Sequence, residues 1–127
     1  MDFHHTDDAP AAIGPYSQAV SEGATVYTSG QIAIDPATGE LVSGGFEAQA
    51  RQVLRNLSRV LASPGCAFSD VLKTTIYVTD LGCFPELNRL YGEAMGEHRP
   101  ARSTVEVASL PKGALVEIDM IAVRRRP

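Results

Sequence analysis

Residues 47–79 read EAQARQVLRNLSRVLASPGCAFSDVLKTTIYVT and hold two different patterns in succession. In the first half, apolar side chains recur every three or four residues, which is the period of one helix face. The pattern predicts a helix from Glu47 to Ala62 that ends before Pro64-Gly65. The expected buried stripe is Ala50, Val53, Leu54, Leu57, Val60 and Leu61. The expected solvent-facing residues are Arg51, Arg55, Asn56 and Arg59.

The second half, Val71 to Thr79, is rich in β-branched and aromatic residues and predicts a strand. Side chains alternate between the two faces of a strand. One face is expected to carry Leu72, Ile76 and Val78. The other is expected to carry Lys73, Thr75, Tyr77 and Thr79.

Further elements are predicted on both sides of this segment. Gly23 separates two short strands of a hairpin, and Pro85 opens a second helix because proline is favoured in a first helical turn. In chain order, these elements are strands Ala19–Glu22 and Thr25–Ser29, turn Asp35–Gly39, helix Pro85–Glu97, and strands Arg102–Val107 and Leu115–Arg124.

The order strands, helix, strand, helix, strands is typical of the α+β class. It predicts one β-sheet with two helices packed on one face. The uncovered face would carry Thr75, Tyr77 and Ile121, which together are too apolar for an open surface. We therefore expect this face to meet another subunit.

The composition is that of an ordinary globular protein. The chain has 127 residues, 44% of them hydrophobic and 20% charged, without an internal repeat or linker, so residues 1–127 are interpreted as a single domain. The net charge of −4 argues against a nucleic-acid partner, because phosphate binding needs a clustered positive face. The one basic run, Arg124 to Arg126, is interpreted as a solvated tail.

Several classes of protein are disfavoured by what the sequence lacks. No apolar run approaches the ~20 residues of a membrane helix, and the first residues do not resemble a signal peptide. Cys66 and Cys83 lack the spacing of a metal or redox site and are expected to be reduced thiols. We expect a cytoplasmic protein that uses no metal or other cofactor.

An arginine and a glutamate stand in predicted strands, where an ionised side chain needs a partner. Arg102 opens one strand, and Glu117 lies inside the next. If these strands form a hairpin that turns between Pro111 and Lys112, Arg102 opposes Ile121 and shares a face with Glu117. The two would then lie roughly 13 Å apart at about 3.4 Å per residue. Because one small ligand does not easily bridge that distance, we expect a composite site between neighbouring subunits.

Each of the two residues has two interpretations. The planar fork of Arg102 suits a substrate carboxylate, which it can hold by two hydrogen bonds, but a salt bridge to Glu106 or Asp119 would also explain it. Glu117 can hold and polarise an attacking water, but pairing with an arginine would also explain it.

Two short motifs and one helix residue add weaker candidates. Tyr16, in the motif GPYSQ at 14–18, could close a pocket, and Ser29 and the Gly30 backbone could line it. A turn and a strand end explain the same residues structurally. Asn88, on the polar side of the second helix, is by itself a surface residue.

A series of motifs lies in order along nearly the whole chain. They are 9–18 (APAAIGPYSQ), 29–32 (SGQI), 35–40 (DPATGE), 73–81 (KTTIYVTDL), 100–107 (PARSTVEV), 116–118 (VEI) and 121–124 (IAVR). Together they resemble the RidA (YjgF) family of enamine/imine deaminases. The resemblance implies a chorismate-mutase-like fold with a mixed sheet, assembled as a homotrimer with a cleft at each subunit boundary. It also implies hydrolysis of 2-aminoacrylate and related imino acids, left by pyridoxal-phosphate-dependent dehydratases, to 2-keto acids and ammonia.

The resemblance also implies roles for individual residues. Arg102 matches the carboxylate-binding arginine, and Glu117 matches the water-positioning glutamate. Pocket residues are matched by Tyr16, Ser29 and Asn88. Thr104 stands where many members have cysteine, so its backbone can still contact the ligand but a role for a thiol there is excluded. Some relatives resemble ligand-binding or chaperone-like stress proteins, so a non-catalytic role on the same trimeric fold is the alternative.

Overall fold

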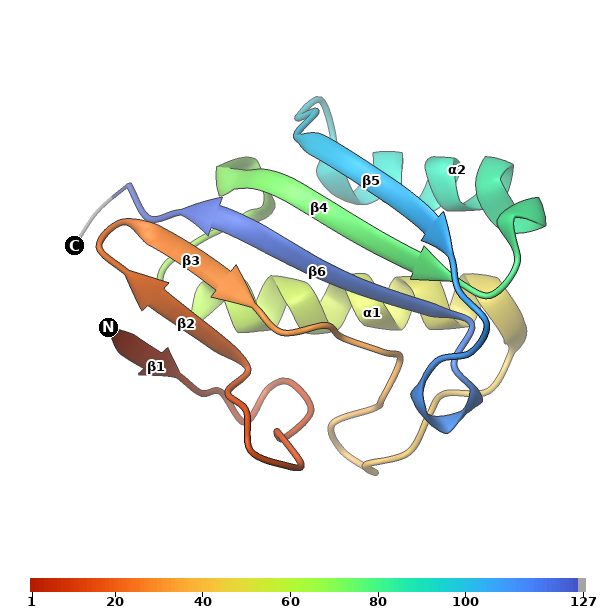
Figure 1. Cartoon of the computed structure of the whole chain (residues 1–127), viewed down its shortest axis with the longest axis horizontal. Coiled ribbons are helices and arrows are strands. Elements are labelled where there is room, and N and C mark those ends of the chain that lie inside the picture. The colour runs from red at the N-terminus through yellow and green to blue at the C-terminus, as the bar shows by residue number, and fades with distance from the viewer. Residues whose placement is uncertain (126–127) are drawn as a thin grey trace.

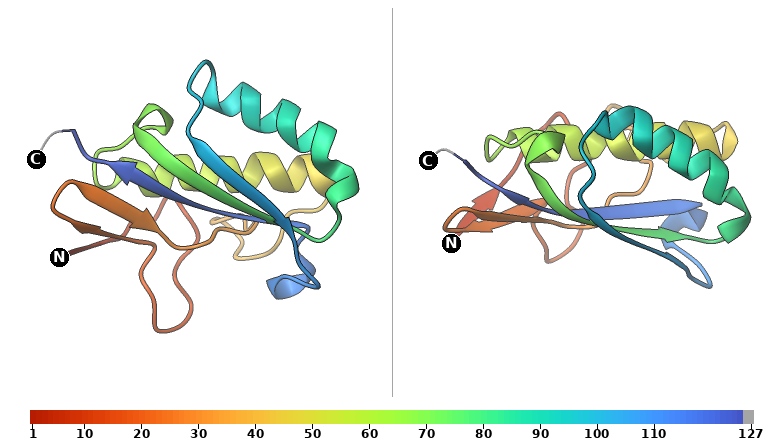
Figure 2. Two further views of the ribbon diagram at one scale, coloured as in Figure 1. Left: turned by 45° about the horizontal axis from the view of Figure 1, so that its top comes forward. Right: turned by 90° about the horizontal axis from the view of Figure 1, so that it is seen from above.

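The computed structural model describes residues 1–125 and contains, within them, a six-stranded sheet and two α-helices (Figure 1). Seen from above, both helices cover one face of the sheet and leave the other open (Figure 2). The strands are β1 (Asp2–His4), β2 (Ala19–Glu22), β3 (Thr25–Thr28), β4 (Val71–Val78), β5 (Ala101–Glu106) and β6 (Val116–Val123), and the helices are α1 (Gly45–Ala62) and α2 (Phe84–Met95). The sheet order is β1-β2-β3-β6-β4-β5, and only β4 and β5 are parallel among these described pairs. The predicted α+β architecture is confirmed.

Helix α1 buries the apolar stripe that its sequence period predicts. All six stripe residues belong to the core, and α1 contacts the central strand β6. The prediction for Asn56 is wrong, because this side chain is 0% exposed. Its amide donates to the carbonyl oxygen of Ile34 at 2.9 Å and accepts a hydrogen bond from Gln52 at 2.8 Å. The loop after β3 turns carbonyl groups toward the helix, so a buried donor is needed there.

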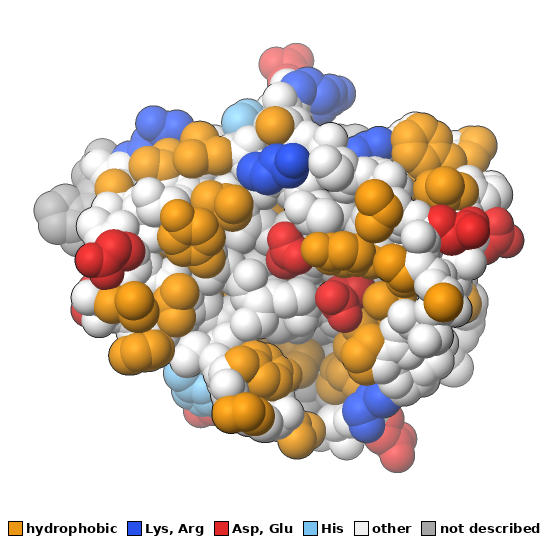
Figure 3. Space-filling view, viewed as in Figure 1, with side chains coloured by type: hydrophobic (Ala, Val, Ile, Leu, Met, Phe, Trp, Pro, Cys, Tyr) orange, Lys and Arg blue, Asp and Glu red, His pale blue; other side chains and the backbone are white. Residues whose placement is uncertain are grey.

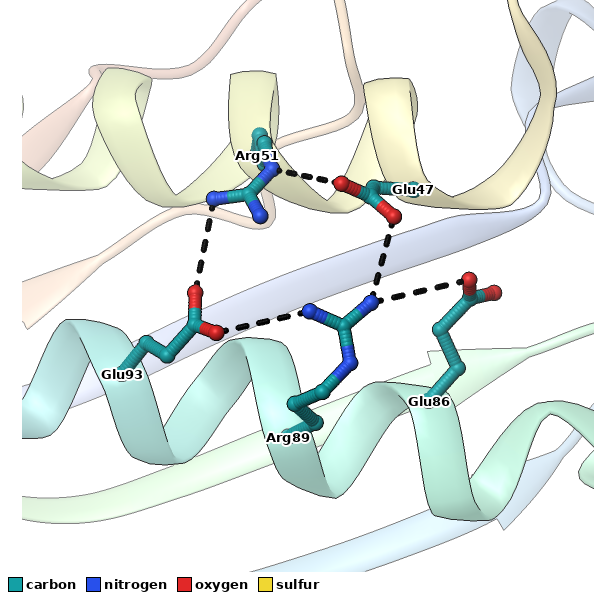
Figure 4. Close-up of polar contacts among 5 residues, drawn as sticks. All are labelled: Glu47, Arg51, Glu86, Arg89 and Glu93. Atoms are coloured by element: carbon teal, nitrogen blue, oxygen red, sulfur yellow. Dashed lines mark hydrogen bonds and ion pairs between the residues drawn. The ribbon is translucent and has the colours of Figure 1, made fainter.

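The outer surfaces of α1 and α2 are joined by ion pairs (Figure 4). Glu47 on α1 pairs with Arg51 at 3.0 Å and reaches across to Arg89 on α2 at 3.1 Å. Glu93 lies 3.4 Å from Arg89 and 3.5 Å from Arg51, and Glu86 lies 3.9 Å from Arg89. Hydrogen bonds from the two arginines hold the pKa of Glu47 below its usual value. We call these five residues the helix ion-pair network.

Strand β4 contains a bulge that reverses one predicted side chain. Its pairing with β6 shifts between Val71 and Lys73, which leaves Leu72 as the extra residue. Val71 is therefore buried, while Leu72 is 49% exposed. The prediction that Leu72 shares a face with Ile76 and Val78 is wrong, because the bulge interrupts the alternation.

Strand β4 also separates the two C-terminal strands, so the predicted hairpin between β5 and β6 does not form. The chain reaches β5 from β4 through helix α2, and a crossover of this kind joins parallel strands. Thr74 of β4 pairs with Arg102 on one side and with Met120 on the other, whereas Tyr77 pairs with Glu117. Thr74 and Met120 are buried beneath the helices, while Tyr77 and Glu117 alternate to the open face. The prediction that Arg102 and Glu117 share a face is therefore wrong.

The open face presents apolar side chains around acidic ones near its centre (Figure 3). One apolar row crosses four strands, because Phe3 pairs with Val20, Val20 with Tyr27, and Tyr27 with Ile121. Phe3 is 71% exposed and Tyr27 is 46% exposed. An exposed apolar surface of this extent is typical of an interaction site.

The basic run at the end of β6 forms more contacts with the rest of the protein than the sequence predicts. Arg124 donates to the carbonyl oxygen of Gly23 at 2.9 Å, and Arg125 pairs with Asp70 at 3.2 Å. The prediction of a solvated tail is therefore wrong for Arg124. Arg126 lies outside the described residues.

The remaining predictions concern cysteines and membrane segments. Cys66 is buried, Cys83 is half-buried, and both are free thiols. Within residues 1–125, none of the helices combines the length and the apolar character needed to cross a membrane.

Candidate active site

A pocket of about 490 Å³ opens at the end of the sheet where β6 begins. Its walls come from the segment before β2, the loop after β3 and the turn before β6. Apolar residues form much of these walls, among them Ile13, Ile32, Ile34, Pro36 and Pro111. Glu117 contributes a carboxylate to this lining.

Glu117 occupies an environment that disfavours its charge. Burial raises the pKa of its carboxyl above the usual value, and the nearby Asp119 carboxylate raises it further. Burial also raises the pKa of Asp119, although a hydrogen bond from Tyr77 opposes that rise. No ion pair involves Glu117 within residues 1–125. Pairing of Glu117 with an arginine of the described part of its own chain is therefore not what holds it in the strand.

Gly30 lies against the Glu117 carboxylate. A Cβ atom built on Gly30 would stand 2.5 Å from Oε2 and 2.8 Å from Cδ of Glu117, which is closer than real Cβ atoms approach. The backbone is fixed at this point because Gln31 and Ile118 exchange two main-chain hydrogen bonds, at 2.9 and 3.1 Å. Only a residue without a Cβ atom fits at position 30. The glycine therefore lets the main chain lie against the Glu117 carboxylate.

Tyr16 and Ser29 take different places around this pocket. Tyr16 lines it and is 51% exposed. The Ser29 hydroxyl donates to the carbonyl oxygen of Ser17 at 2.6 Å, so it holds the segment that carries Tyr16. Buried Gln18 secures the same segment through hydrogen bonds to the backbone of Thr6 and Pro10. Tyr16 therefore lies at the pocket, where its role stays a prediction, whereas Ser29 acts on the pocket only through the segment that it supports.

Arg102 lies away from this pocket, on the side of the sheet that α2 covers. Its Nη2 donates to Oδ1 of Asn88 at 2.8 Å. Its guanidinium carbon lies 5.1 Å from the ring centre of Tyr91 and 5.5 Å from that of Phe84. Tyr91 is in turn anchored by a hydrogen bond from its hydroxyl to the Thr74 hydroxyl at 2.9 Å. The arginine is therefore oriented by one face of a helix.

The candidate residues thus fall into two groups that do not meet within one chain. Glu117, Gly30 and Tyr16 surround the pocket at the start of β6. Arg102 lies beside α2, where it contacts Asn88 of that helix. The predicted salt bridges from Arg102 to Glu106 or Asp119 are absent from residues 1–125, where Glu106 instead accepts a hydrogen bond from the backbone of Leu81 at 2.9 Å.

The comparison with known proteins identifies the family. The family model described as Endoribonuclease L-PSP matches residues 6–124. Among solved structures, RidA from the Antarctic bacterium Psychrobacter sp. PAMC 21119 is similar, with 46% sequence identity and a TM-score of 0.93 over 97% of this chain and 99% of that one. This chain belongs to the RidA family.

Three further similar proteins have other printed names. The human 2-iminobutanoate/2-iminopropanoate deaminase is 45% identical over 119 residues, covering 94% of this chain and 87% of that protein. Protein DfrA of Myxococcus xanthus is 53% identical over 121 residues, covering 94% of this chain and 92% of that protein. The structure of E. coli TdcF with bound serine shares 42% identity and a TM-score of 0.92, over 98% of this chain and 99% of that one.

In this RidA-family chain, three residues that the sequence did not single out contact the candidate site: Gln18 lines the pocket, and Phe84 and Tyr91 lie against Arg102. Phe84 and Tyr91 flank Asn88 at intervals of four and three residues, which places all three on one helix face. That spacing was available in the sequence, but nothing in it indicated which strand the face would meet. Gln18 is a buried polar residue, and its partners are set by the path of the chain before β2.

Thr104 lies two residues beyond Arg102 on the same strand and pairs with Ile76. Its hydroxyl is buried and has no hydrogen-bond partner among the described residues. A buried hydroxyl without a partner is costly, by about 1–3 kcal/mol. Contact between the Thr104 backbone and a ligand stays a prediction.

Proposed function

We propose that this protein hydrolyses reactive 2-imino acids, of the kind formed from 2-aminoacrylate, to 2-keto acids and ammonia. The observation that carries the proposal is the Glu117 carboxylate, half-buried beside Gly30 in a pocket and without a cationic partner in the described part of its own chain. The similarity to the human 2-iminobutanoate/2-iminopropanoate deaminase supports the substrate class.

Glu117 would act on water. A carboxylate whose pKa is raised toward the working pH is a stronger general base than one at its ordinary pKa. The water oxygen bonds to the imine carbon while Glu117 takes one water proton, which then passes to the nitrogen. In the resulting carbinolamine the hydroxyl proton passes to the amino nitrogen, the C–N bond breaks with its electrons leaving on ammonia, and the electrons of the former O–H bond form the keto C=O bond. The reaction involves no change of redox state, so we propose no cofactor for it.

Arg102 would hold the substrate carboxylate. Asn88 and the rings of Phe84 and Tyr91 orient the guanidinium, while its Nε and Nη1 groups have no partner in residues 1–125. Together with the second N–H of Nη2, the free Nη1 group can form a two-point contact with a carboxylate. Fixing the acid in this way orients the imine carbon for attack, which is the kind of contribution that proximity makes to catalysis.

The complete site would form between two copies of the chain. Arg102 and Glu117 project from opposite faces of one sheet, so one small imino acid cannot reach both within a subunit. The apolar row from Phe3 to Ile121 offers a surface for association. We propose the homotrimer that the family resemblance implies, with Arg102 from one copy facing Glu117 from the next.

The activity is tested by forming 2-aminoacrylate in situ with a serine dehydratase and trapping the remaining imine with semicarbazide. The native protein should accelerate formation of the 2-keto acid, and Arg102→Ala should lower kcat/KM by more than about tenfold, because a charged hydrogen-bonding grip is lost. Equal rates with and without the native protein would favour the alternative of a ligand-binding or chaperone-like protein.

The composite site is tested by mixing two inactive variants. Arg102→Ala and Glu117→Gln are unfolded together and refolded at equal concentrations, which distributes them among the trimers. If each site takes one residue from each copy, about one quarter of the sites regain both residues by random assembly. Mixed samples no more active than either variant alone would contradict the proposed arrangement.

A further inference from the structure

A hollow of about 300 Å³ lies between the last turns of α2 and the start of β5, apart from the Glu117 pocket. Its wall is made of Asn88, Tyr91, Gly92, Arg99, Pro100 and Arg102. Two of these residues are cationic and none is acidic. In a chain with a net charge of −4, this places two positive charges together on one small concave surface.

Arg99 is held in place by the end of helix α2. Its Nη1 donates to the carbonyl oxygen of His98 at 2.9 Å and also to that of Gly96. Its Nε and Nη2 groups have no hydrogen-bond or ion-pair partner in the described part of the chain. A cation is favoured at a helix C-terminus, so this position orders the guanidinium without neutralising it.

Both arginines act on the same neighbour. Burial raises the pKa of the Tyr91 hydroxyl, while the positive charges of Arg102 and Arg99 both oppose that rise. Arg102 lies over the ring of Tyr91 at 5.1 Å. Tyr91 and both guanidinium groups therefore line the same hollow, and neither arginine pairs with a carboxylate in residues 1–125. Like charges brought together are unfavourable unless an anion joins them.

We infer that Arg99 is a second anion-binding residue and that the hollow takes a 2-imino acid with two carboxylates. The inference rests on the proposed function and adds the substrate class to it. The 2-carboxylate occupies Arg102, as in the proposed reaction, and the side-chain carboxylate reaches Nε and Nη2 of Arg99. Imino acids derived from aspartate and glutamate, 2-iminosuccinate and 2-iminoglutarate, have this chemistry. One bidentate guanidinium satisfies a single carboxylate, so a monocarboxylic imine leaves Arg99 unused.

The competing explanation is that Arg99 only stabilises the C-terminal end of α2. The two explanations differ in what an Arg99 variant changes. A helix-terminal cation affects the stability of the fold, and loss of that cation lowers activity toward all imines alike. A substrate-binding arginine affects the ratio between dicarboxylic and monocarboxylic imines.

The experiment compares kcat/KM for 2-iminoglutarate, formed by a glutamate oxidase with catalase, and for 2-iminobutanoate, formed by a threonine dehydratase. The proteins are the native chain, Arg99→Gln, Arg99→Lys and the control Arg59→Gln. Arg59 is an exposed arginine on α1 whose Nη1 donates to the carbonyl oxygen of Asp8. Arg99→Gln should lose about tenfold or more for 2-iminoglutarate and less than about twofold for 2-iminobutanoate. Arg99→Lys should keep part of the preference, and Arg59→Gln should keep all of it.

Binding measurements separate the inference from the proposed function. Isothermal titration calorimetry with 2-oxoglutarate and 2-oxobutanoate, the two keto-acid products, does not require turnover. The native protein should bind 2-oxoglutarate more tightly than 2-oxobutanoate, and Arg99→Gln should abolish the difference. Hydrolysis of 2-iminobutanoate with an unchanged ratio in Arg99→Gln overturns the inference and leaves the proposed function standing. Tight, Arg99-dependent binding of 2-oxoglutarate without acceleration of either imine overturns the proposed function and retains the dianion site.

Discussion

Two groups of carboxylates in this protein have opposite electrostatic environments. On the outer helix surface, Glu47 is paired with two arginines, and its pKa is lowered. On the open face, Glu117 and Asp119 are half-buried near one another, and the pKa of each is raised. The same functional group is thus stabilised as an anion in one place and destabilised in the other. The first arrangement is complete within the chain, whereas the second is typical of a site that acts on another molecule.

The largest expected effect comes from removing the unpaired carboxylate. Glu117→Gln keeps the size of the side chain but removes the proposed general base, so kcat should fall by about 100-fold or more. The free energy of unfolding should stay the same or rise, because a charge that burial disfavours is no longer present. Steady-state kinetics and urea unfolding measure the two quantities. A matched fall in both activity and stability would make Glu117 a structural residue.

A smaller but still large effect is expected from Gly30→Ala. The added Cβ would stand 2.5 Å from Glu117 Oε2, so the carboxylate or the backbone has to move. We expect a loss of about 1–3 kcal/mol in the free energy of unfolding and a fall in kcat that exceeds the rise in KM.

The control for Gly30→Ala is the pair of changes Gly30→Ala and Glu117→Ala in one chain. Shortening residue 117 removes the atoms that the new Cβ meets. The Gly30→Ala change should therefore lower stability less in the Glu117→Ala background than in the native one. Equal losses in the two backgrounds would show that the contact with Glu117 is not the cause.

The pH dependence should differ in sign between the two carboxylate groups. Because folding raises the pKa of Glu117 and Asp119, their contribution to stability is fully present below their ordinary values of 4.5 and 3.8 and is lost as pH rises through the raised values. Folding lowers the pKa of Glu47, so its contribution is present above 4.5 and is lost as pH falls.

Thermal unfolding at a series of pH values between about 3.5 and 8 measures how Tm depends on pH for each carboxylate group. Replacing both open-face carboxylates, by Glu117→Gln and Asp119→Asn, should raise Tm relative to the native protein at the upper end. Glu47→Gln should lower Tm relative to the native protein at that same end, where Glu47 is ionised and paired. If Tm changed with pH in the same way in the double variant and in Glu47→Gln, the expected difference between the two carboxylate groups would be contradicted. In the native protein, kcat/KM should fall as pH falls through the raised pKa of Glu117.

The smallest effect is expected in the helix ion-pair network. Arg89 contacts three of its glutamates, but the side chains are about half exposed and water screens the charges. Arg89→Gln should lower Tm by less than about 4 °C and leave kcat/KM unchanged. The difference in Tm should shrink further at high salt. A large, salt-insensitive loss would show that the network holds the helices together more strongly than exposed ion pairs do.

The local elements of the fold were predictable from the sequence. The apolar period of α1 identified its buried stripe, because a helix face repeats every three to four residues wherever the helix is placed. The β-rich segment located β4 in the same way. Pro85 marked the start of α2, and Gly23 marked the turn of the β2–β3 hairpin. The errors within these elements, Asn56 and Leu72, arose where a neighbouring loop or a bulge changed the environment of a single residue.

The site was predictable as a set of residue types but not as an arrangement. The motifs around Arg102 and Glu117 identified the two charged residues and the family, since the chemistry of each residue is already present in its side chain. Only the tertiary structure placed β4 between their strands and so turned Arg102 toward α2 and Glu117 toward the open face. Strand pairing joins residues that are distant in sequence, and a strand inserted between two others changes which side chains share a face. The sequence by itself therefore determined which chemical groups are available for the proposed reaction, while the sheet topology decided which of them can meet within one chain.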